Sequence, residues 1–399
     1  MKILHTADWH LGKKLWKFSR LEEQVTVLDE IVSIVERENI DIVLIAGDCF
    51  DQINPSTEAI QLFYATLFRL SRNGQTCIFV VSGNHDSPER IDAPSPLGGY
   101  NQIYFTGQFN KKIDYIDNDY FTFIKSEPGF VELVKKNEKG HLRLLLTPYV
   151  NELRLNQEIK QGEGRTHFTH IMTQYWKDQI AQHVDGDGTT LIVTHLLFSE
   201  TDFAGESGEE KPIIYSGGTE PLKPECIPDL VDYVATGHLH RCHSVGDKIW
   251  YSGSPLAYSF SETDQVKGVI VLETEGNRTS TRRNVPLSSG YPLKKKTFSN
   301  IKEAVQWLQN NQECYVELHL VLDSFLSYAD QQLLIGAHKR CLIVPEVIGQ
   351  TKEERNQGPD LTLPIDELFK SYFQSIKNSD VNDDIMDMFN EVLATKGDS

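Results

Sequence analysis

Five short apolar segments of this 399-residue chain each end on polar side chains of the kind that bind metal ions. The segments are rich in β-branched residues and cover residues 2–5, 41–46, 76–81, 190–193 and 231–235. Runs of this length and composition predict strands of a sheet that is buried on both faces. Because open α/β sheets place their sites at the carboxyl ends of the strands, we expect the five ends to meet.

The motifs that follow the segments supply carboxylates, an amide and histidines in a fixed order along the chain. They are Asp8-Trp9-His10, Gly47-Asp48-Cys49-Phe50-Asp51, Gly83-Asn84-His85-Asp86, Thr194-His195 and Gly237-His238-Leu239-His240. On an extended backbone, residues two apart point to the same side, so each Asp-x-His or His-x-His pair can face one site. The set is large enough for two divalent metals, and paired metals about 3.5–4 Å apart are a recurring device for cleaving phosphate esters.

The ordered set resembles that of the calcineurin-like metallophosphoesterases. Within that superfamily, residues 3–12, 46–51, 83–87, 232–241 and 251–256 resemble the SbcD nuclease subunits. The resemblance implies an α/β fold with a metallophosphoesterase β-sandwich flanked by helices over residues 1–280. It also implies a small α/β capping domain over residues 285–350 and a helical partner-binding tail over residues 360–399.

The same resemblance implies a role for each site residue. Asp48 would bridge two metals, Asp8, His10 and His240 would complete the first shell, and Asn84, His195 and His238 the second. His85 would stay off the metals and act on the phosphate as a catalytic residue, and Asp51 would hydrogen-bond His85 and orient it. Mixed imidazole and carboxylate shells suit manganese, iron or zinc, and the resemblance favours manganese.

Several of these residues have simpler interpretations. Asp51 fits a helix N-cap, and Asp86 fits a turn or a residue behind the ligands better than a ligand. Cys49 fits a small buried side chain, and His5 lies off the motif pattern and is expected to be packed.

Two helices are predicted between the first three strands. Residues 20–37 and 57–72 place apolar side chains at helical spacing, including Leu21, Val25 and Leu28. This alternation of strands and helices indicates an α/β fold.

The charge of the chain is unusual for a nucleic-acid enzyme. The formal net charge is −18, whereas nucleic-acid binders usually carry a basic surface. Lys13, Lys14, Lys17 and Arg20 directly follow the first ligands, so they are the candidate DNA phosphate contacts. The alternative is a solvated loop. We therefore expect DNA as a partner but with weak intrinsic affinity.

Composition also predicts where the protein works. No run of 18 apolar residues is present, so no membrane span is expected. Because the first residues read as a strand, no signal peptide is expected, and the six cysteines are scattered. Reduced thiols in the cytoplasm fit this pattern better than disulfides.

The C-terminal third predicts a module and a tail. Asn300 and Glu303 fit a capping box, residues 314–322 and 341–344 fit strands, and residues 328–339 fit a helix. After a polar linker at 351–359, short amphipathic helices begin at Pro364 and near Ile385. Such helices need a surface, either the chain's own core or a partner. The resemblance implies that the tail binds the coiled-coil ATPase SbcC, and it allows a homodimer of the nuclease domain.

Three functions remain open from the sequence. The first is the nuclease subunit of an SbcCD-like complex in DNA repair, replication and recombination. It would hydrolyse DNA phosphodiesters as a 3′-5′ double-strand exonuclease, a single-strand endonuclease and an opener of hairpins. The second is a two-metal phosphoesterase acting on a nucleotide or a phosphoprotein, and the third is a non-catalytic scaffold. The chain has no P-loop motif, so any ATP dependence would come from the partner.

Overall fold

The computed structural model describes residues 1–138, 140–151, 155, 164–199, 221–275 and 278–348, and residues 369, 370, 381, 385, 386 and 389. The chain divides into two compact units. The first contains Met1–Lys296, Gln309–Glu317 and His338–Leu342. The second contains Thr297–Leu308, Leu318–Ala337 and Ile343–Ser399.

Two stacked sheets form the centre of the first unit. The six-stranded sheet has the order β15-β14-β1-β4-β5-β6. Its strands are β1 (Lys2–Thr6), β4 (Ile42–Ala46), β5 (Cys77–Val81), β6 (Ile103–Thr106), β14 (Gly268–Glu275) and β15 (Arg278–Pro286). The five predicted strands are confirmed, but only three of them, β1, β4 and β5, belong to this sheet.

The other two predicted strands lie in a second, seven-stranded sheet with the order β12-β13-β11-β10-β9-β8-β7. Its strands are β7 (Phe121–Glu127), β8 (Phe130–Lys135), β9 (Leu142–Thr147), β10 (Thr189–Thr194), β11 (Tyr233–Thr236), β12 (His243–Val245) and β13 (Ile249–Tyr251). Within each sheet the ligand-bearing strands are parallel, so their carboxyl ends share one edge.

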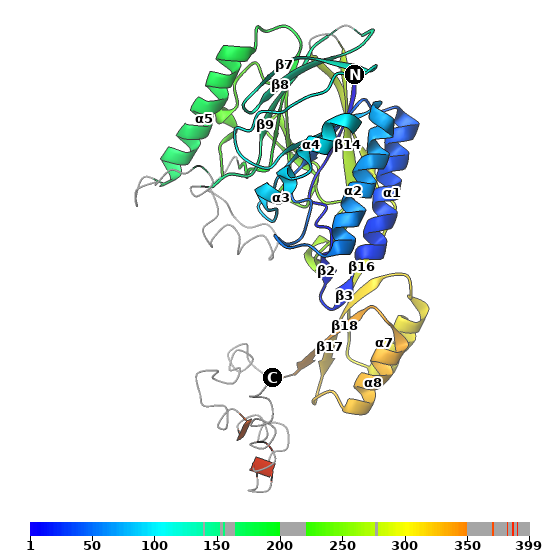
Figure 1. Cartoon of the computed structure of the whole chain (residues 1–399). Coiled ribbons are helices and arrows are strands. Elements are labelled where there is room, and N and C mark those ends of the chain that lie inside the picture. Colours follow the sequence, from blue (N-terminus) through cyan, green and yellow to red (C-terminus); the bar gives the residue numbers. More distant parts are fainter. Residues whose placement is uncertain are drawn as a thin grey trace. The chain divides into compact units, whose positions relative to one another are not determined.

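The central strands are buried on both faces because successive side chains enter different cores. Val43 packs in the core beneath helices α1 (Leu21–Glu38) and α2 (Thr57–Ser71), whereas Leu44 packs between the sheets. On the second sheet, Val193 faces the first sheet and Ile192 packs with Trp176 of α5 (Gly164–His183). The result is a β-sandwich covered by helices on its two outer faces, with α1 and α2 side by side and α5 opposite them (Figure 1).

The predicted helices of the first unit are confirmed to within one residue at each end. The Ser56 hydroxyl accepts from the Ala59 N–H at 3.3 Å, which caps the start of α2. Asn39 ends α1 in the left-handed conformation, with φ 53°. Val25 is an exception to the predicted apolar face, because it is exposed. The short elements are β2 (Lys14–Leu15), β3 (Phe18–Ser19), α3 (Pro88–Asp92), α4 (Ser95–Gly98), and the 3-10 helices η1 (Arg72–Gly74), η2 (Gly99–Asn101), η3 (Pro224–Cys226) and η4 (Phe260–Glu262).

The C-terminal module contains a three-stranded sheet with the order β16-β17-β18 and two helices. Its elements are β16 (Leu293–Phe298), α7 (Ile301–Asn310), β17 (Tyr315–Leu322), α8 (Tyr328–Ala337) and β18 (Cys341–Val347). Asn300 accepts from the Lys302 and Glu303 N–H groups at 2.8 and 3.4 Å, which confirms it as the cap of α7. The sequence did not predict β16, because its lysine run lacks an apolar alternation.

Residues 200–220 and the predicted linker at 351–359 lie outside the described residues. The tail helices also lie outside them, apart from the six single residues. Among these, the rings of Phe369 and Phe389 stack with centroids 3.9 Å apart. No helix within the described part of the chain is long and apolar enough to cross a membrane.

Candidate metal centre

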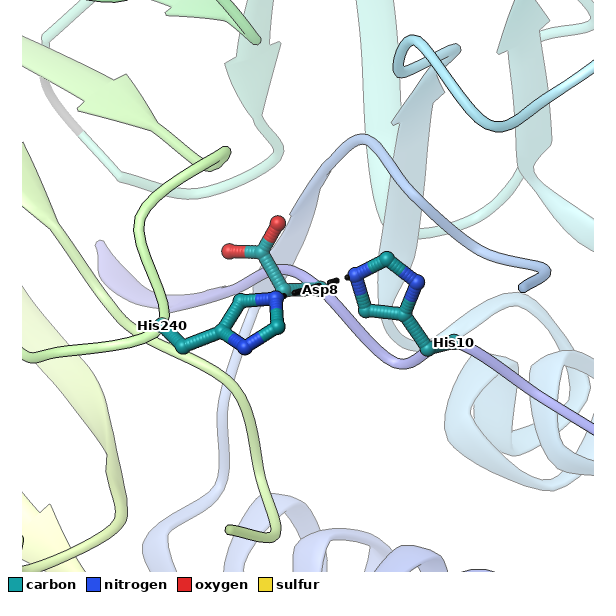
Figure 2. Close-up of side chains that lie close together, drawn as sticks. All are labelled: Asp8, His10 and His240. Atoms are coloured by element: carbon teal, nitrogen blue, oxygen red, sulfur yellow. Dashed lines mark hydrogen bonds between the residues drawn. The ribbon is translucent and has the colours of Figure 1, made fainter. Parts of the chain in front are cut away.

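The predicted ligands gather where the carboxyl ends of the two sheets meet. One group of potential ligand atoms comes from Asp8, His10 and His240, and a second comes from Asp8, Asp48 and His195. Within each group the ligand atoms all lie within 4.8 Å of one another. Figure 2 shows the side chains of the first group converging from the loops after β1 and β11. Asp8 belongs to both groups, and a third group of His10, Asp51 and His85 shares His10 with the first, so neighbouring positions for two metal ions are available.

The remaining predicted ligands adjoin the second group. The Asn84 side-chain oxygen lies 3.1 Å from Nε2 of His195 and 3.0 Å from Nδ1 of His238. The amide therefore joins two histidines from the second sheet to a loop of the first sheet. All seven predicted ligands are thus brought together.

Asp48 occupies the position expected of a bridging ligand. Its Oδ2 lies 3.3 Å from Nε2 of His195 and 3.6 Å from Nε2 of His10. These two histidines were predicted for different metals. A carboxylate oxygen placed between them can contact both ions.

Hydrogen bonds fix which nitrogen two of the histidines offer. Nδ1 of His195 donates to the Ala46 carbonyl at 2.7 Å, and Nδ1 of His240 lies 3.2 Å from Oε1 of Glu262. Such partners fix the orientation of each ring, so that Nε2 faces the other ligand groups. Nε2 of His240 lies 3.1 Å from Nε2 of His10. Two atoms each about 2.1 Å from one ion, at a right angle, would lie about 3.0 Å apart.

The charges of the site also suit a metal. Burial lowers the pKa of His10 to about 4 and of His238 to about 3, so both are neutral and carry a free lone pair near neutral pH. Burial also lowers the pKa of His195, but the charges of Asp48 and Asp8 outweigh it and raise that pKa to about 9. The buried Oδ2 of Asp8 has no hydrogen-bond partner among the described residues. A cation between these groups would satisfy that oxygen and replace the proton of His195.

Four of the seven ligands have left-handed backbone. The φ angles are 53° at Asp8, 43° at His10, 48° at Asp48 and 89° at His238. The expectation of an extended backbone at the Asp8–His10 and His238–His240 pairs is therefore wrong, although both pairs do face the site. Each such residue costs roughly 1–3 kcal/mol and persists only where the surroundings impose it.

Close packing of the ligand loops imposes this geometry in part. A Cβ on Gly83 would lie 2.0 Å from Oδ1 of Asp48, so only glycine fits there. Asp86 accepts from the N–H groups of Cys49, Phe50 and Gly83 at 3.1, 3.0 and 2.8 Å, which ties two ligand loops together. Asp86 is a residue behind the ligands, as predicted.

Comparison with known proteins gives the family. The family model described as Calcineurin-like phosphoesterase matches residues 1–242. The SbcD subunit of the nuclease SbcCD from Bacillus subtilis (strain 168) is 33% identical over 97% of this chain and 96% of its own length. The chain belongs to the SbcD family of calcineurin-like phosphoesterases.

A second SbcD-family protein supports this assignment. The SbcD subunit of the nuclease SbcCD from Staphylococcus epidermidis (strain ATCC 12228 / FDA PCI 1200) is 31% identical over 72% of this chain and 70% of its own length. The predicted nuclease function and the need for divalent metal ions are confirmed at this level.

The hydrogen bond between Asp51 and His85 differs from the predicted one. Nδ1 of His85 donates to the backbone carbonyl of Asp51 at 2.8 Å, not to its side chain. The carboxylate lies 3.0 Å from Nζ of Lys13 and 3.6 Å from Nδ1 of His10. Asp51 starts no described helix, so the N-cap interpretation is also wrong.

One of the four candidate DNA contacts does not fit. The Arg20 side chain is buried, donates to Glu23 at 2.5 and 3.0 Å and to the Ala257 carbonyl at 2.7 Å, and cannot bind a phosphate. Lys13 is paired with Asp51. Lys14 and Lys17 are exposed in the β2–β3 hairpin, beside the exposed Trp16.

Three residues behind the first ligand group were missed from the sequence. Glu262 pairs with His240 and with Lys267, while Gln24 and Tyr258 hold the backbone of the Asp8–His10 turn. Gln24 lies on the buried face of α1, outside all of the ligand motifs. The sequence therefore gave no signal that connects it to the metal ligands. His5 is packed, as predicted, with Nδ1 3.0 Å from the Tyr233 hydroxyl.

Proposed function

We propose that this SbcD-family protein uses two manganese ions to hydrolyse DNA phosphodiesters. It acts as a 3′-5′ double-strand exonuclease, a single-strand endonuclease and an opener of hairpins. The observation that carries the proposal is the Asp48 carboxylate between His10 and His195. Bound divalent ions lower the pKa of water and neutralise phosphate charge, which are the two needs of this reaction.

His85 acts on the phosphate rather than on the metals. Its Nδ1 is bound to the Asp51 carbonyl, so Nε2 is the ring nitrogen that would face a phosphate. The ring lies beside His10, with centroids 4.9 Å apart, so Nε2 can reach a phosphate at the ligand group. When protonated, Nε2 donates to a phosphate oxygen or to the leaving 3′ oxygen.

The β2–β3 hairpin supplies the DNA contacts. Lys14 and Lys17 offer charge to phosphates, and Trp16, 63% exposed, offers a face on which a base can stack. The hairpin begins four residues after His10. A DNA backbone bound to the hairpin therefore extends to the metal ions. The whole chain carries a net charge of −18, so the hairpin alone binds DNA only weakly. The remaining DNA affinity comes from a partner.

The two relatives are named as subunits of a nuclease SbcCD, and the partner of this chain is an SbcC-like coiled-coil ATPase. The tail after residue 360 binds it, and residues 285–350 form a capping domain that shapes DNA access. The nuclease domain forms a homodimer, for which the exposed Leu97 and Tyr100, at 73% and 75%, provide apolar surface. The complex works in the cytoplasm, in DNA repair, replication and recombination.

The main test uses Asp48→Ala with hairpin DNA, linear duplex DNA and a small chromogenic phosphodiester, each with and without manganese. The variant loses both metals and all cleavage, while Asp92→Ala, a carboxylate bound to the Gly107 N–H outside the site, keeps them. Retained cleavage by Asp48→Ala would refute the two-metal interpretation. Cleavage of the small ester without any DNA cleavage would favour a nucleotide or phosphoprotein phosphatase, and no cleavage by the natural chain would favour a scaffold.

The partner is tested by truncation after residue 350. The shortened chain keeps its metals and cleaves the small ester, but no longer co-purifies with the ATPase. Co-purification of the shortened chain would place the ATPase contact elsewhere.

A further inference from the structure

The turn that carries Asp8 and His10 is held from two sides. On one side, the backbone N–H groups of Asp8 and His10 donate to the carbonyls of Gly47 and Asp48, each at 3.0 Å. These bonds join the turn to another ligand loop. They do not explain what keeps the opposite side of the turn in its left-handed conformation.

Two buried side chains from distant segments hold that opposite side. Nε2 of Gln24 donates to the His10 carbonyl at 2.8 Å, and its Oε1 accepts from the Gly12 N–H at 3.0 Å. The Tyr258 hydroxyl donates to the Trp9 carbonyl at 2.5 Å and accepts from Nε2 of Gln24 at 3.0 Å. Gln24 and Tyr258 are only 1% and 2% exposed, so water does not replace these bonds.

Tyr258 also lies against the ligand rings themselves. Its ring centroid is 5.8 Å from that of His10 and 6.0 Å from that of His240, both edge-on. One side chain therefore contacts both imidazoles of the first ligand group and binds the backbone between Asp8 and His10.

We propose that Gln24 and Tyr258 are positioning residues that hold Asp8 and His10 in the strained conformation needed to bind the first metal. The inference rests on the proposed metal-dependent function. It adds that metal affinity depends on two residues that are not themselves among the predicted ligands. Without them, the turn relaxes toward ordinary φ angles, and the carboxylate and imidazole separate.

The structure provides a matched control pair. Gln102 and Tyr104 are also buried, their side chains are hydrogen-bonded to each other at 3.1 Å, and Gln102 donates to the Ile116 carbonyl at 2.6 Å. They bind the backbone at Ile116, in a segment that contains none of the predicted metal ligands. Tyr104→Phe and Gln102→Met therefore remove the same kinds of bond as Tyr258→Phe and Gln24→Met.

The experiment measures manganese binding to the metal-stripped full-length chain by calorimetry, with thermal unfolding in EDTA. Tyr258→Phe and Gln24→Met each lower the affinity of one of two manganese sites by roughly 10–100-fold, the range typical of residues behind a metal shell. Their melting temperatures in EDTA fall no further than those of the control pair. Saturating manganese restores cleavage in both variants.

Two results would overturn the inference. The first is unchanged manganese affinity in both variants. The second is an affinity loss matched by the control pair, which would make the effect one of general stability. If the natural chain binds no manganese at all, the proposed function fails instead, and the two failures are thereby distinguished.

Discussion

Nδ1 of His85 donates a hydrogen bond to the backbone carbonyl of Asp51 at 2.8 Å. Because a carbonyl can only accept, this bond fixes the proton on Nδ1. The hydrogen bond does not use the Asp51 carboxylate, which instead faces Lys13 and His10. A substitution of the Asp51 side chain therefore keeps the hydrogen bond that orients His85. The roles of the two residues can thus be tested independently.

His85→Ala should keep both metals and lose turnover by about 10²–10⁴-fold, because a positioned proton donor is worth about that much. The measurement is metal content beside single-turnover cleavage under saturating manganese. Loss of a metal would make His85 a ligand, and unchanged cleavage would remove it from the reaction.

Asp51→Asn should leave the orientation of His85 intact, because the variant retains the backbone carbonyl. The loss should appear instead in manganese affinity, since the carboxylate that faces His10 is neutralised. Cleavage titrated with manganese checks this, and near-normal turnover at saturation is expected. A turnover defect equal to that of His85→Ala would show that the carboxylate itself takes part.

The metal-free protein should lose stability as pH rises from about 6.5 to about 9. The pKa of His195 is raised from 6.5 to about 9 on folding. Its contribution is therefore complete below 6.5 and is lost as the folded group deprotonates. Thermal unfolding in EDTA across this range tests the prediction. His195→Asn should flatten the slope, while His141→Asn, outside the site, should not.

Metal binding should release a proton from His195 near neutral pH for the same reason. Calorimetry in buffers of different ionisation enthalpy measures this release. An equal release from the His195→Asn variant would assign the proton to another group.

Glu262→Gln should weaken manganese binding by roughly 10–100-fold, because Glu262 holds Nδ1 of His240. Burial alone would raise the pKa of Glu262, but the His240 hydrogen bond and the charge of Lys267 lower it to about 2, so it is ionised. Glu132→Gln is the matched control, since this buried glutamate also pairs with a histidine, His141, at 2.7 Å. Equal metal affinities in the two variants would contradict the role of Glu262.

Lys14→Ala and Lys17→Ala should each weaken DNA binding and reduce the salt dependence of log affinity by about 0.9 for each phosphate that the lysine no longer neutralises. Binding measured at several salt concentrations tests this. Lys136→Ala, an exposed lysine just after β8, should leave both quantities unchanged. An unchanged slope in the hairpin variants would indicate that Lys14 and Lys17 are solvated, as the alternative interpretation holds.

The sequence determined the strands, the main helices of the first unit and the seven candidate ligands. Apolar runs such as residues 42–46 and 77–81 report burial directly, because every position on a doubly buried strand must be apolar. The ligand motifs stand at the ends of these runs, so their approximate location follows. The predicted tail helices lie mostly outside the described residues, and their role remains a prediction.

The way in which the ligands are held follows from contacts between segments far apart in the sequence. Gln24 and Tyr258 are separated by 234 positions, yet they share a hydrogen bond and the Asp8–His10 turn. The Asp51 contact goes through the backbone, and Arg20 turns inward to Glu23, although the sequence shows only a carboxylate and a basic cluster. The physical reason is that periodicity and composition encode which surfaces are buried. They do not encode which atoms of distant segments meet once the two sheets have packed.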